Sequence, residues 1–490
     1  MKRAIVLSVT VVLLALILLG VFINSDAPSS NVLNKVVIDD GAFYVGVTYC
    51  GNSTSEAKLL IDKVKNYTNL FVLQSGTLQN DTDAINEVGD YAVNSGLHFI
   101  AFFGTGSGWL MKEWFDIYDG CWGDSFLGVY YGDERGGKML DDELHFYDQE
   151  TMSSILKAAD GSISGYKIDP GTSVTYKRDG TILTQTEDAE SYTITTYYTN
   201  GTITVLTLQK DSNDPDEATI IEDGSQPPMH ISGPTSIPSP TIVEDESLLA
   251  YSYEELWNAR PFQSIDETTQ RFVDGIDVRQ YIPRNQSIVT FTSDYVLYWF
   301  DYLLDYDVVL AQLGWNHTTA QDIALVRGAA NLQNKTWGAI ITWKYRQPPY
   351  LASGDEIYQQ LHTAYTNGAK YVAIFNYAED MTGSYGTLQP EHFQALERFW
   401  NQDVQNPNVT RGEVKAEAVF VLPKNYGWGM RKPDDIVWGL WQPPAEYQQI
   451  WPKLQDLLAI YGEKLDIIYD DPAYPLGDRY QQVYYWNQTS

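Results

Sequence analysis

The sequence predicts an α/β protein built on a (β/α)8 TIM barrel, with a β-rich insertion, a small C-terminal α/β domain and an N-terminal transmembrane helix. Three patterns indicate this: eight short apolar runs that alternate with amphipathic helical stretches, a long break after the fourth run, and one apolar run at the N-terminus. The 490 residues exceed one ordinary domain of roughly 100–200 residues but fit a large barrel with appendages. The predicted parts are an anchor (1–25), a linker (26–36), a barrel (37–410) with its insertion (150–285), and a C-terminal domain (411–490).

The N-terminal run indicates a signal anchor. Lys2 and Arg3 precede a stretch without charged residues from Ala4 to Ile23, close to the ~20 residues that span a bilayer as a helix. A cleaved signal peptide is the alternative, but its apolar core usually has only ~7–15 residues, and no small-x-small cleavage site precedes Asp26. The two basic residues predict a cytoplasmic N-terminus. We therefore expect a single-pass protein of the cell membrane whose C-terminal ectodomain lies outside the cell.

Two further features favour an extracellular location. Cys50 ends the first predicted strand and Cys121 lies between the third and fourth, so both belong to one end of the barrel. In an oxidising compartment this pair is a candidate disulfide, and two unpaired cysteines are the alternative. Asn-x-Ser/Thr sequons also predict a glycoprotein. They occur at Asn52, Asn66, Asn80, Asn200, Asn285, Asn316, Asn334, Asn408 and Asn487.

The composition excludes several classes of partner. The chain has 64 acidic and 32 basic residues and a formal net charge of −32. Such an acidic surface disfavours nucleic acids and binding to anionic lipid through a basic patch, because both need basic faces. The six histidines and two cysteines show no zinc spacing, and there is no dinucleotide fingerprint. We therefore expect no metal and no cofactor.

The barrel is predicted from strand–helix units. The strands are near-continuous apolar runs, as in parallel strands buried on both faces, and a doubly wound open sheet is the alternative. They are predicted over Tyr44–Tyr49, Leu70–Leu73, His98–Phe103, Phe126–Tyr131, Ile288–Thr292, Asp307–Leu313, Trp337–Thr342 and Tyr371–Phe375. The helices are predicted over Ser55–Tyr67, Asp81–Ser95, Tyr295–Tyr306, Thr318–Leu332, Gly354–Thr366 and Glu391–Asp403.

The insertion and the C-terminal domain have different patterns. The insertion predicts hairpins, with turns at Arg178–Gly180 and Asn200–Gly201, followed by an exposed loop over Asp223–Ser247. Its strands are predicted over Tyr166–Lys177, Thr181–Thr186, Tyr192–Tyr198 and Thr202–Gln209. The C-terminal domain is predicted from a strand, a helix and a strand over Ala416–Leu422, Ala445–Tyr461 and Leu465–Tyr469.

The loops after the barrel strands are where we expect the site, because barrel sites lie at the carboxyl ends of the strands. These ends are rich in aromatic, amide and carboxylate side chains, which complement the apolar faces and hydroxyl fringe of a sugar. Packing at the barrel mouth is the alternative for the aromatic residues. The candidate substrate-binding residues are Tyr49, Gln74, Asp133, Trp315, Asn316, Trp343, Lys344, Tyr345, Asn376 and Tyr377.

A short motif carries a resemblance to a known group. The segment Gly128–Glu134 (GVYYGDE) resembles the end of the fourth strand in barrel glycoside hydrolases, where an acidic residue commonly serves as general acid/base. The resemblance covers about residues 40–405 and implies cleavage of glycosidic bonds with Glu134 in that role. An ion pair of Glu134 with Arg135 or Lys138 is the alternative. The C-terminal segment faintly resembles the flavodoxin-like accessory domains of some of these enzymes.

A second carboxyl group is harder to find. Direct hydrolysis needs two, roughly 5–5.5 Å apart for retention and about 6.5–9.5 Å apart for inversion. The resemblance implies a glutamate at the end of the seventh strand, yet residues 341–345 (ITWKY) contain no acid. The substitutes are Asp294, which we favour, and Glu379 or Asp380. The alternatives are a helix N-cap for Asp294 and solvated loop acids for the other two.

The sequence also predicts the surroundings of two further charged side chains. Asp133 is expected to point away from Glu134 if the strand continues through this pair, because side chains alternate along a strand. Lys344 is expected to bind a carboxylated sugar or to pair with Glu134 or Asp294.

The sequence is compatible with two functions. The first function is an anchored glycoside hydrolase acting on a carbohydrate substrate. The second is a catalytically inactive barrel that binds glycans or serves as a cell-envelope structural protein.

Overall fold

The computed structural model of the chain describes most of the region from residue 41 to residue 488. The described residues are 41–118, 120–141, 144–148, 153–157, 163–167, 172–176, 182–187, 191–210, 218–222, 230–231, 264–283, 287–315, 317–377 and 383–488. No helix within these ranges is long and apolar enough to cross a membrane. The predicted anchor Ala4–Ile23 and the linker lie outside them, so both stay predictions.

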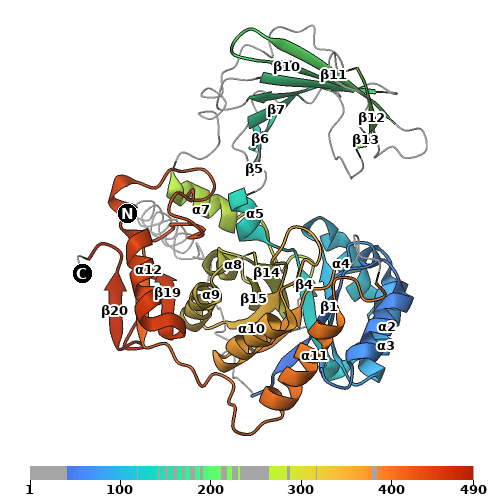
Figure 1. Cartoon of the computed structure of the whole chain (residues 1–490), viewed down its shortest axis with the longest axis vertical. Coiled ribbons are helices and arrows are strands. Elements are labelled where there is room, and N and C mark those ends of the chain that lie inside the picture. Colours follow the sequence, from blue (N-terminus) through green and yellow to red (C-terminus); the bar gives the residue numbers. More distant parts are fainter. Residues whose placement is uncertain are drawn as a thin grey trace, which may run out of the picture. The chain divides into compact units, whose positions relative to one another are not determined.

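Eight parallel strands close into a barrel, which confirms the barrel and excludes the open sheet (Figure 1). Around the barrel the strand order is β1-β17-β16-β15-β14-β4-β3-β2. The first four strands have the predicted bounds, whereas the fifth begins and ends two residues later than expected, at Asp294. The strands are β1 Tyr44–Tyr49, β2 Leu70–Leu73, β3 His98–Phe103, β4 Phe126–Tyr131, β14 Thr290–Asp294, β15 Val308–Leu313, β16 Thr336–Ile341 and β17 Tyr371–Ile374.

Helices pack on the outside of these strands, as α8, α9 and α10 show in Figure 1. The helix α4 was not predicted, although its Trp114 is fully buried, because the glycine-rich segment before it suggested a loop. A second apolar core fills the barrel interior and includes Val72, Ile100, Tyr130 and Phe291. The helices are α2 Thr54–Val64, α3 Thr82–Asn94, α4 Gly108–Ile117, α5 Arg135–Asp141, α7 Ile265–Val273, α8 Tyr298–Leu303, α9 Thr319–Gln333, α10 Gly354–Thr366 and α11 Pro390–Phe399.

The insertion forms one antiparallel sheet of nine strands in sequence order. The single strand predicted over Tyr166–Lys177 is wrong: β7 and β8 pair there as separate strands. The predicted turn at Asn200–Gly201 is confirmed, with Gly201 at φ 83°, a conformation that favours glycine. The strands are β5 Leu144–Asp148, β6 Ser153–Lys157, β7 Ile163–Lys167, β8 Thr172–Tyr176, β9 Ile182–Glu187, β10 Ser191–Tyr197, β11 Ile203–Lys210, β12 Ala218–Glu222 and β13 His230–Ile231.

The C-terminal segment is a small parallel sheet with strand order β19-β18-β20, and helix α12 packs against it. The strand β20 was not predicted. The elements are β18 Ala418–Leu422, α12 Ile450–Tyr461, β19 Leu465–Tyr469 and β20 Gln482–Tyr485.

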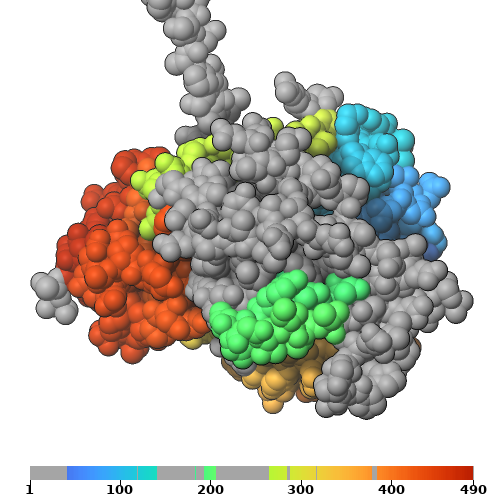
Figure 2. Space-filling view, turned by 90° about the horizontal axis from the view of Figure 1, so that it is seen from above, coloured from blue at the N-terminus to red at the C-terminus, as the bar shows by residue number. Residues whose placement is uncertain are grey.

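This sheet lies against the barrel helix α9. The guanidinium of Arg327 in α9 is buried and pairs with Asp466 of β19 at 2.7 Å. A Cβ at Gly328 would come within 2.6 Å of the carbonyl oxygen of Ile467, so only glycine permits this approach. The C-terminal residues also reach α7, where the side chain of Asn425 donates to Asp266 at 2.8 Å. Figure 2 shows the orange-red C-terminal residues beside the yellow-green segment that contains α7.

Candidate functional site

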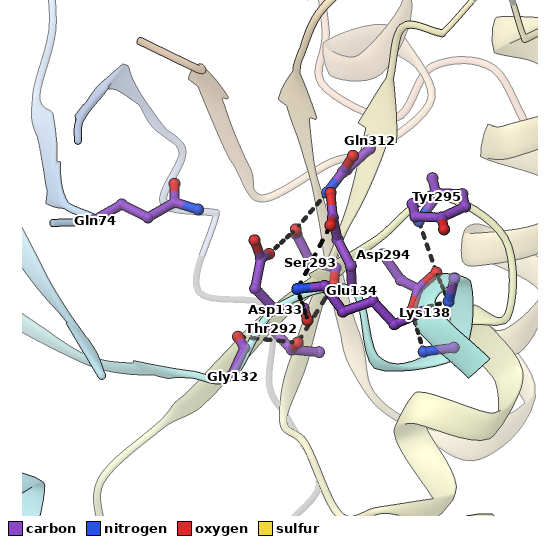
Figure 3. Close-up of polar contacts among 12 residues, drawn as sticks. Gln74, Gly132, Asp133, Glu134, Lys138, Thr292, Ser293, Asp294, Tyr295 and Gln312 are labelled. Atoms are coloured by element: carbon purple, nitrogen blue, oxygen red, sulfur yellow. Dashed lines mark hydrogen bonds and ion pairs between the residues drawn. The ribbon is translucent and has the colours of Figure 1, made fainter. Parts of the chain in front are cut away.

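The strand β4 ends just before two carboxylates. Gly132 has φ 75° and Glu134 has φ 55°, so the chain turns sharply before α5 begins at Arg135. The turn ends the alternation of side chains, and Asp133 and Glu134 both reach toward the ends of β14 and β15 (Figure 3). The strand would have to continue through this pair for Asp133 to point away from Glu134, and it stops at Tyr131 instead.

A chain of hydrogen bonds connects the two carboxylates. The Nε2 of Gln312 donates to Glu134 Oε1 at 2.6 Å and to Ser293 Oγ at 2.9 Å, and Ser293 Oγ donates to Asp133 Oδ1 at 2.7 Å (Figure 3). These three bonds set an upper limit of about 8 Å on the separation of the two hydrogen-bonded carboxyl oxygens. Trp315 Nε1 donates to the Oε1 of Gln312 at 3.0 Å, which fixes the side of the amide that faces Glu134.

The two carboxylates have different surroundings. Burial raises the pKa of Asp133, although hydrogen bonds from Ser293 and from the Tyr130 hydroxyl, at 2.5 Å, act against it. Glu134 retains 24 % of its side-chain exposure, and the ammonium of Lys138 lies 3.7 Å from its Oε2. Lys138 is itself about half exposed, so water screens this ion pair. The structure therefore places two partly exposed carboxylates side by side, of which Asp133 is the more strongly held by hydroxyl donors.

Asp294 has a structural environment. Its side chain has no accessible surface and accepts hydrogen bonds from the backbone N–H groups of Gly136, Gly137, Tyr295 and Val296 at 2.5–3.1 Å. These bonds hold the start of α5, the helix that follows Glu134. A carboxylate without accessible surface cannot touch a substrate, so this geometry does not support Asp294 as the second catalytic group. The alternative role of Asp294, as an N-cap for the helix that follows it, agrees with the bonds from Tyr295 and Val296. The bonds from the amides of α5 were not expected.

A second buried carboxylate lies behind Asp294. Asp301 in α8 is fully buried, and neither of its oxygens has a hydrogen-bond partner within the described part of the chain. Burial raises the pKa of Asp301 well above its usual range, and the charge of Asp294 raises it further. The neutral acid is therefore the form that the fold favours.

Replacement of Asp301 by asparagine is expected to stabilise the protein at neutral pH. A raised pKa means that the folded state holds a proton that the unfolded state releases above pH ~4, which costs about 1.4 kcal/mol for each tenfold shift in the proton-binding constant. Asparagine is neutral in both states, so its advantage should grow from pH 4 to pH 8 in thermal unfolding. The exposed Asp456→Asn is the control. An advantage independent of pH would contradict the argument.

Aromatic rings stand near the ends of β15, β16 and β17. The ring of Trp343 lies 5.5 Å from that of Tyr377 and 6.0 Å from that of Trp315. All three are partly exposed, as a sugar platform requires. On the other side of the mouth, Gln74 is buried and its Nε2 lies 3.4 Å from the Tyr130 hydroxyl, while its Oε1 has no partner among the described residues.

Other predicted substrate-binding residues make structural contacts. Lys344 pairs with Glu356 at the start of α10, at 2.6 Å, so the alternative pairing with Glu134 or Asp294 is wrong. Asn376 is buried and accepts from the backbone N–H of Thr387 at 3.0 Å. The exposed ring of Tyr345 lies 5.7 Å from the ammonium of Lys344.

Two polar residues near strand ends connect the site. Ser293 of β14 and Gln312 of β15 each stand next to the last residue of their strand and hold the acidic pair, as their position at the carboxyl end of a strand predicts. The predicted candidates Asn316, Glu379 and Asp380 lie outside the described residues. Within the described residues there is no group of three or more histidine, cysteine or acidic side chains that could hold a metal.

The predicted disulfide between Cys50 and Cys121 is wrong, because the two thiols are not bonded. Cys50 stays at the mouth, where its sulfur lies 3.6 Å from the hydroxyl of Thr48. The segment with Cys121 is anchored elsewhere: Trp122 packs against Gly89 of α3, and its Nε1 donates to Asp90 at 2.7 Å. This aromatic anchor fixes the loop outside the barrel.

The chain was compared with family models, curated proteins and solved structures. No family model and no curated protein matches the chain. Among solved structures, it is similar to the chain described as "Crystal structure of GH5_18 from Streptomyces cattleya in complex with GlcNAc". The TM-score is 0.44 at 9 % sequence identity, over 91 % of this chain and 98 % of that one.

Proposed function

We propose that this protein is a membrane-anchored extracellular glycoside hydrolase that cleaves poly- or oligosaccharides by general acid/base catalysis. The observation that carries the proposal is the pairing of Asp133 and Glu134 at the barrel mouth, held within about 8 Å by Ser293 and Gln312. Hydrolysis of this kind needs one carboxyl group that donates a proton to the leaving oxygen. It also needs a second carboxyl group that acts as nucleophile or as base for the attacking water.

The surroundings suggest a role for each group. Glu134 is partly exposed and serves as the acid that protonates the leaving oxygen. Asp133 is fixed by two hydroxyl donors and stabilises positive charge as it develops on the sugar. Trp315, Trp343 and Tyr377 provide the apolar faces on which sugar rings pack. Glu379 is proposed as the carboxylate on the opposite side of the sugar, which attacks the sugar carbon or takes a proton from the attacking water.

The location rests on sequence features. The apolar segment Ala4–Ile23 anchors the chain, and the sequons suit a glycosylated ectodomain. The acidic surface, with a net charge of −32, repels anionic polysaccharides, so a neutral glycan is the expected substrate.

A specific observation favours a second candidate, a barrel that binds glycans without cleaving them. The strand β16 is followed by Thr342, Trp343 and Lys344, so the seventh strand of the barrel supplies no acid. Aromatic rings and amides would still bind sugars in such a protein.

The release of reducing ends from a panel of neutral polysaccharides tests these functions. We expect the wild type to release them and the double variant Asp133→Asn/Glu134→Gln to release none. The control is Glu113→Gln, which alters an exposed acid on α4. Equal activity in the wild type and the double variant would contradict the proposed site. Binding of a glycan without cleavage would establish the second candidate.

A further inference from the structure

A cavity of about 340 Å³ lies at the barrel mouth away from the acidic pair. Its walls come from the segments that follow β1, β2 and β17. In the closed barrel β17 stands four places from β4 in either direction, so it is the strand opposite β4. The cavity therefore faces Asp133 and Glu134 across the mouth. The side chains on which the argument depends are Tyr49, Cys50, Glu56, Tyr377 and Tyr385.

The cavity lies close to the residues around the acidic pair. Tyr377 lines the cavity, and its ring also lies 5.5 Å from Trp343 in the aromatic group near β16. Cys50 lines the cavity as well, and the charge of Asp133 contributes to the raised pKa of its thiol. One extended ligand can therefore contact both places.

The carboxylate of Glu56 determines which ligands the cavity can bind. It is the only charged side chain among the described residues that line the cavity, and it stands exposed in the first turn of α2. The hydroxyl of Tyr49 donates to Glu56 Oε2 at 3.2 Å and itself accepts from the backbone N–H of Ser53 at 3.1 Å. This relay orients the carboxylate. A fixed carboxylate beside two tyrosine side chains suits the hydroxyl groups of a sugar and repels a uronic acid or a sulfated sugar.

We propose that this cavity binds a neutral sugar residue of the glycan whose bond is cleaved at Glu134, and that Glu56 accepts hydrogen bonds from its hydroxyl groups. The inference rests on the proposed function and adds the chemical class of the substrate and a residue that selects it. Because the cavity lies across the mouth from the acidic pair, its contribution appears only with substrates long enough to cross the mouth. Truncated substrates lose this binding energy.

Kinetics with Glu56→Gln test the proposal. We expect kcat/KM for long neutral oligosaccharides to fall about 10-fold or more, as for a hydrogen bond lost to a charged acceptor, while the rate with a monosaccharide aryl glycoside stays unchanged. An oligosaccharide with a uronic acid at the far unit should be a poor substrate of the wild type and should improve with the variant. Glu87→Gln, an exposed acid in the neighbouring helix α3, is the matched control.

Calorimetry with Glu134→Gln separates this inference from the proposed function. This chain should bind the long oligosaccharide, and the added change Glu56→Gln should weaken the binding about 10-fold. If hydrolysis is absent but this difference in affinity is found, the proposed function fails and the cavity assignment stands. If hydrolysis depends on Glu134 while Glu56→Gln changes neither affinity nor kcat/KM, the cavity assignment fails alone. Loss of aryl glycoside cleavage in Glu56→Gln would also overturn it, because Glu56 would then serve the reaction itself.

Discussion

Replacement of Glu134 by glutamine is expected to lower kcat for natural glycans by on the order of 10²- to 10⁴-fold, the usual contribution of a general acid. Glutamine has the same shape and can keep a contact with Gln312 after its amide turns, so the mouth should stay folded. What it lacks is the proton that the departing oxygen needs. The neighbouring Asp133 keeps its orientation in this variant, because the Ser293 and Tyr130 hydroxyls both donate to its Oδ1.

A series of aryl glycosides checks the role of the acid. A leaving group with a low pKa departs without protonation, so Glu134→Gln should cleave a dinitrophenyl glycoside almost as fast as the wild type for the bond-breaking step. The difference should widen as the leaving-group pKa rises. The exposed Glu113→Gln should follow the wild type throughout. A defect of equal size for every leaving group would show that Glu134 positions the substrate and does not donate the proton.

Replacement of Asp294 by alanine is expected to destabilise the fold by about 3 kcal/mol or more. The carboxylate accepts from four backbone N–H groups, and alanine would leave these donors buried without an acceptor. Gly136 and Gly137 leave no room for a larger rearrangement, since a Cβ on either would clash with Leu297 or Tyr295. Activity should fall as well, because the same bonds hold the start of α5 beside Glu134.

Denaturant unfolding measures this loss. The control Asp456→Ala, on the exposed face of α12, should change stability by less than about 0.5 kcal/mol. Asp294→Asn should fall between the two, because its amide oxygen accepts some of the bonds without the charge. If Asp294→Ala were as stable as the control, the capping role of this carboxylate would be excluded.

The barrel was predictable because its strands are apolar on both faces. The runs over Tyr44–Tyr49 and His98–Phe103 have the expected bounds to the residue, and a glycine closely follows each of them, at Gly51 and Gly104. The insertion was less predictable because its strands are short and separated by few turn residues, as at Tyr166–Lys177. Local patterns of this kind do not show where one short strand stops and the next begins.

The site was predictable in position more than in detail. Strand ends located Asp133, Glu134 and Trp343 at the mouth, because every strand of a parallel barrel ends on the same side. The common orientation of Asp133 and Glu134 was not predictable, since it depends on a left-handed conformation at a glutamate. Glu56 was missed because it lies on a helix, where an acid in the first turn is expected for capping alone.

The helix α9 bears on whether residues 411–490 form a domain separate from the barrel. Nearly all of its residues are buried, because the barrel covers one side and β19 covers the other. Its Arg327 is surrounded by groups from both, including Asn367 at 2.5 Å and the carbonyl oxygen of Leu465 at 3.0 Å. Without the C-terminal sheet, a guanidinium and an apolar helix face would meet water. We therefore expect the barrel and residues 411–490 to unfold together in one transition, so that the boundary at residue 410 separates two topologies and not two independently stable domains.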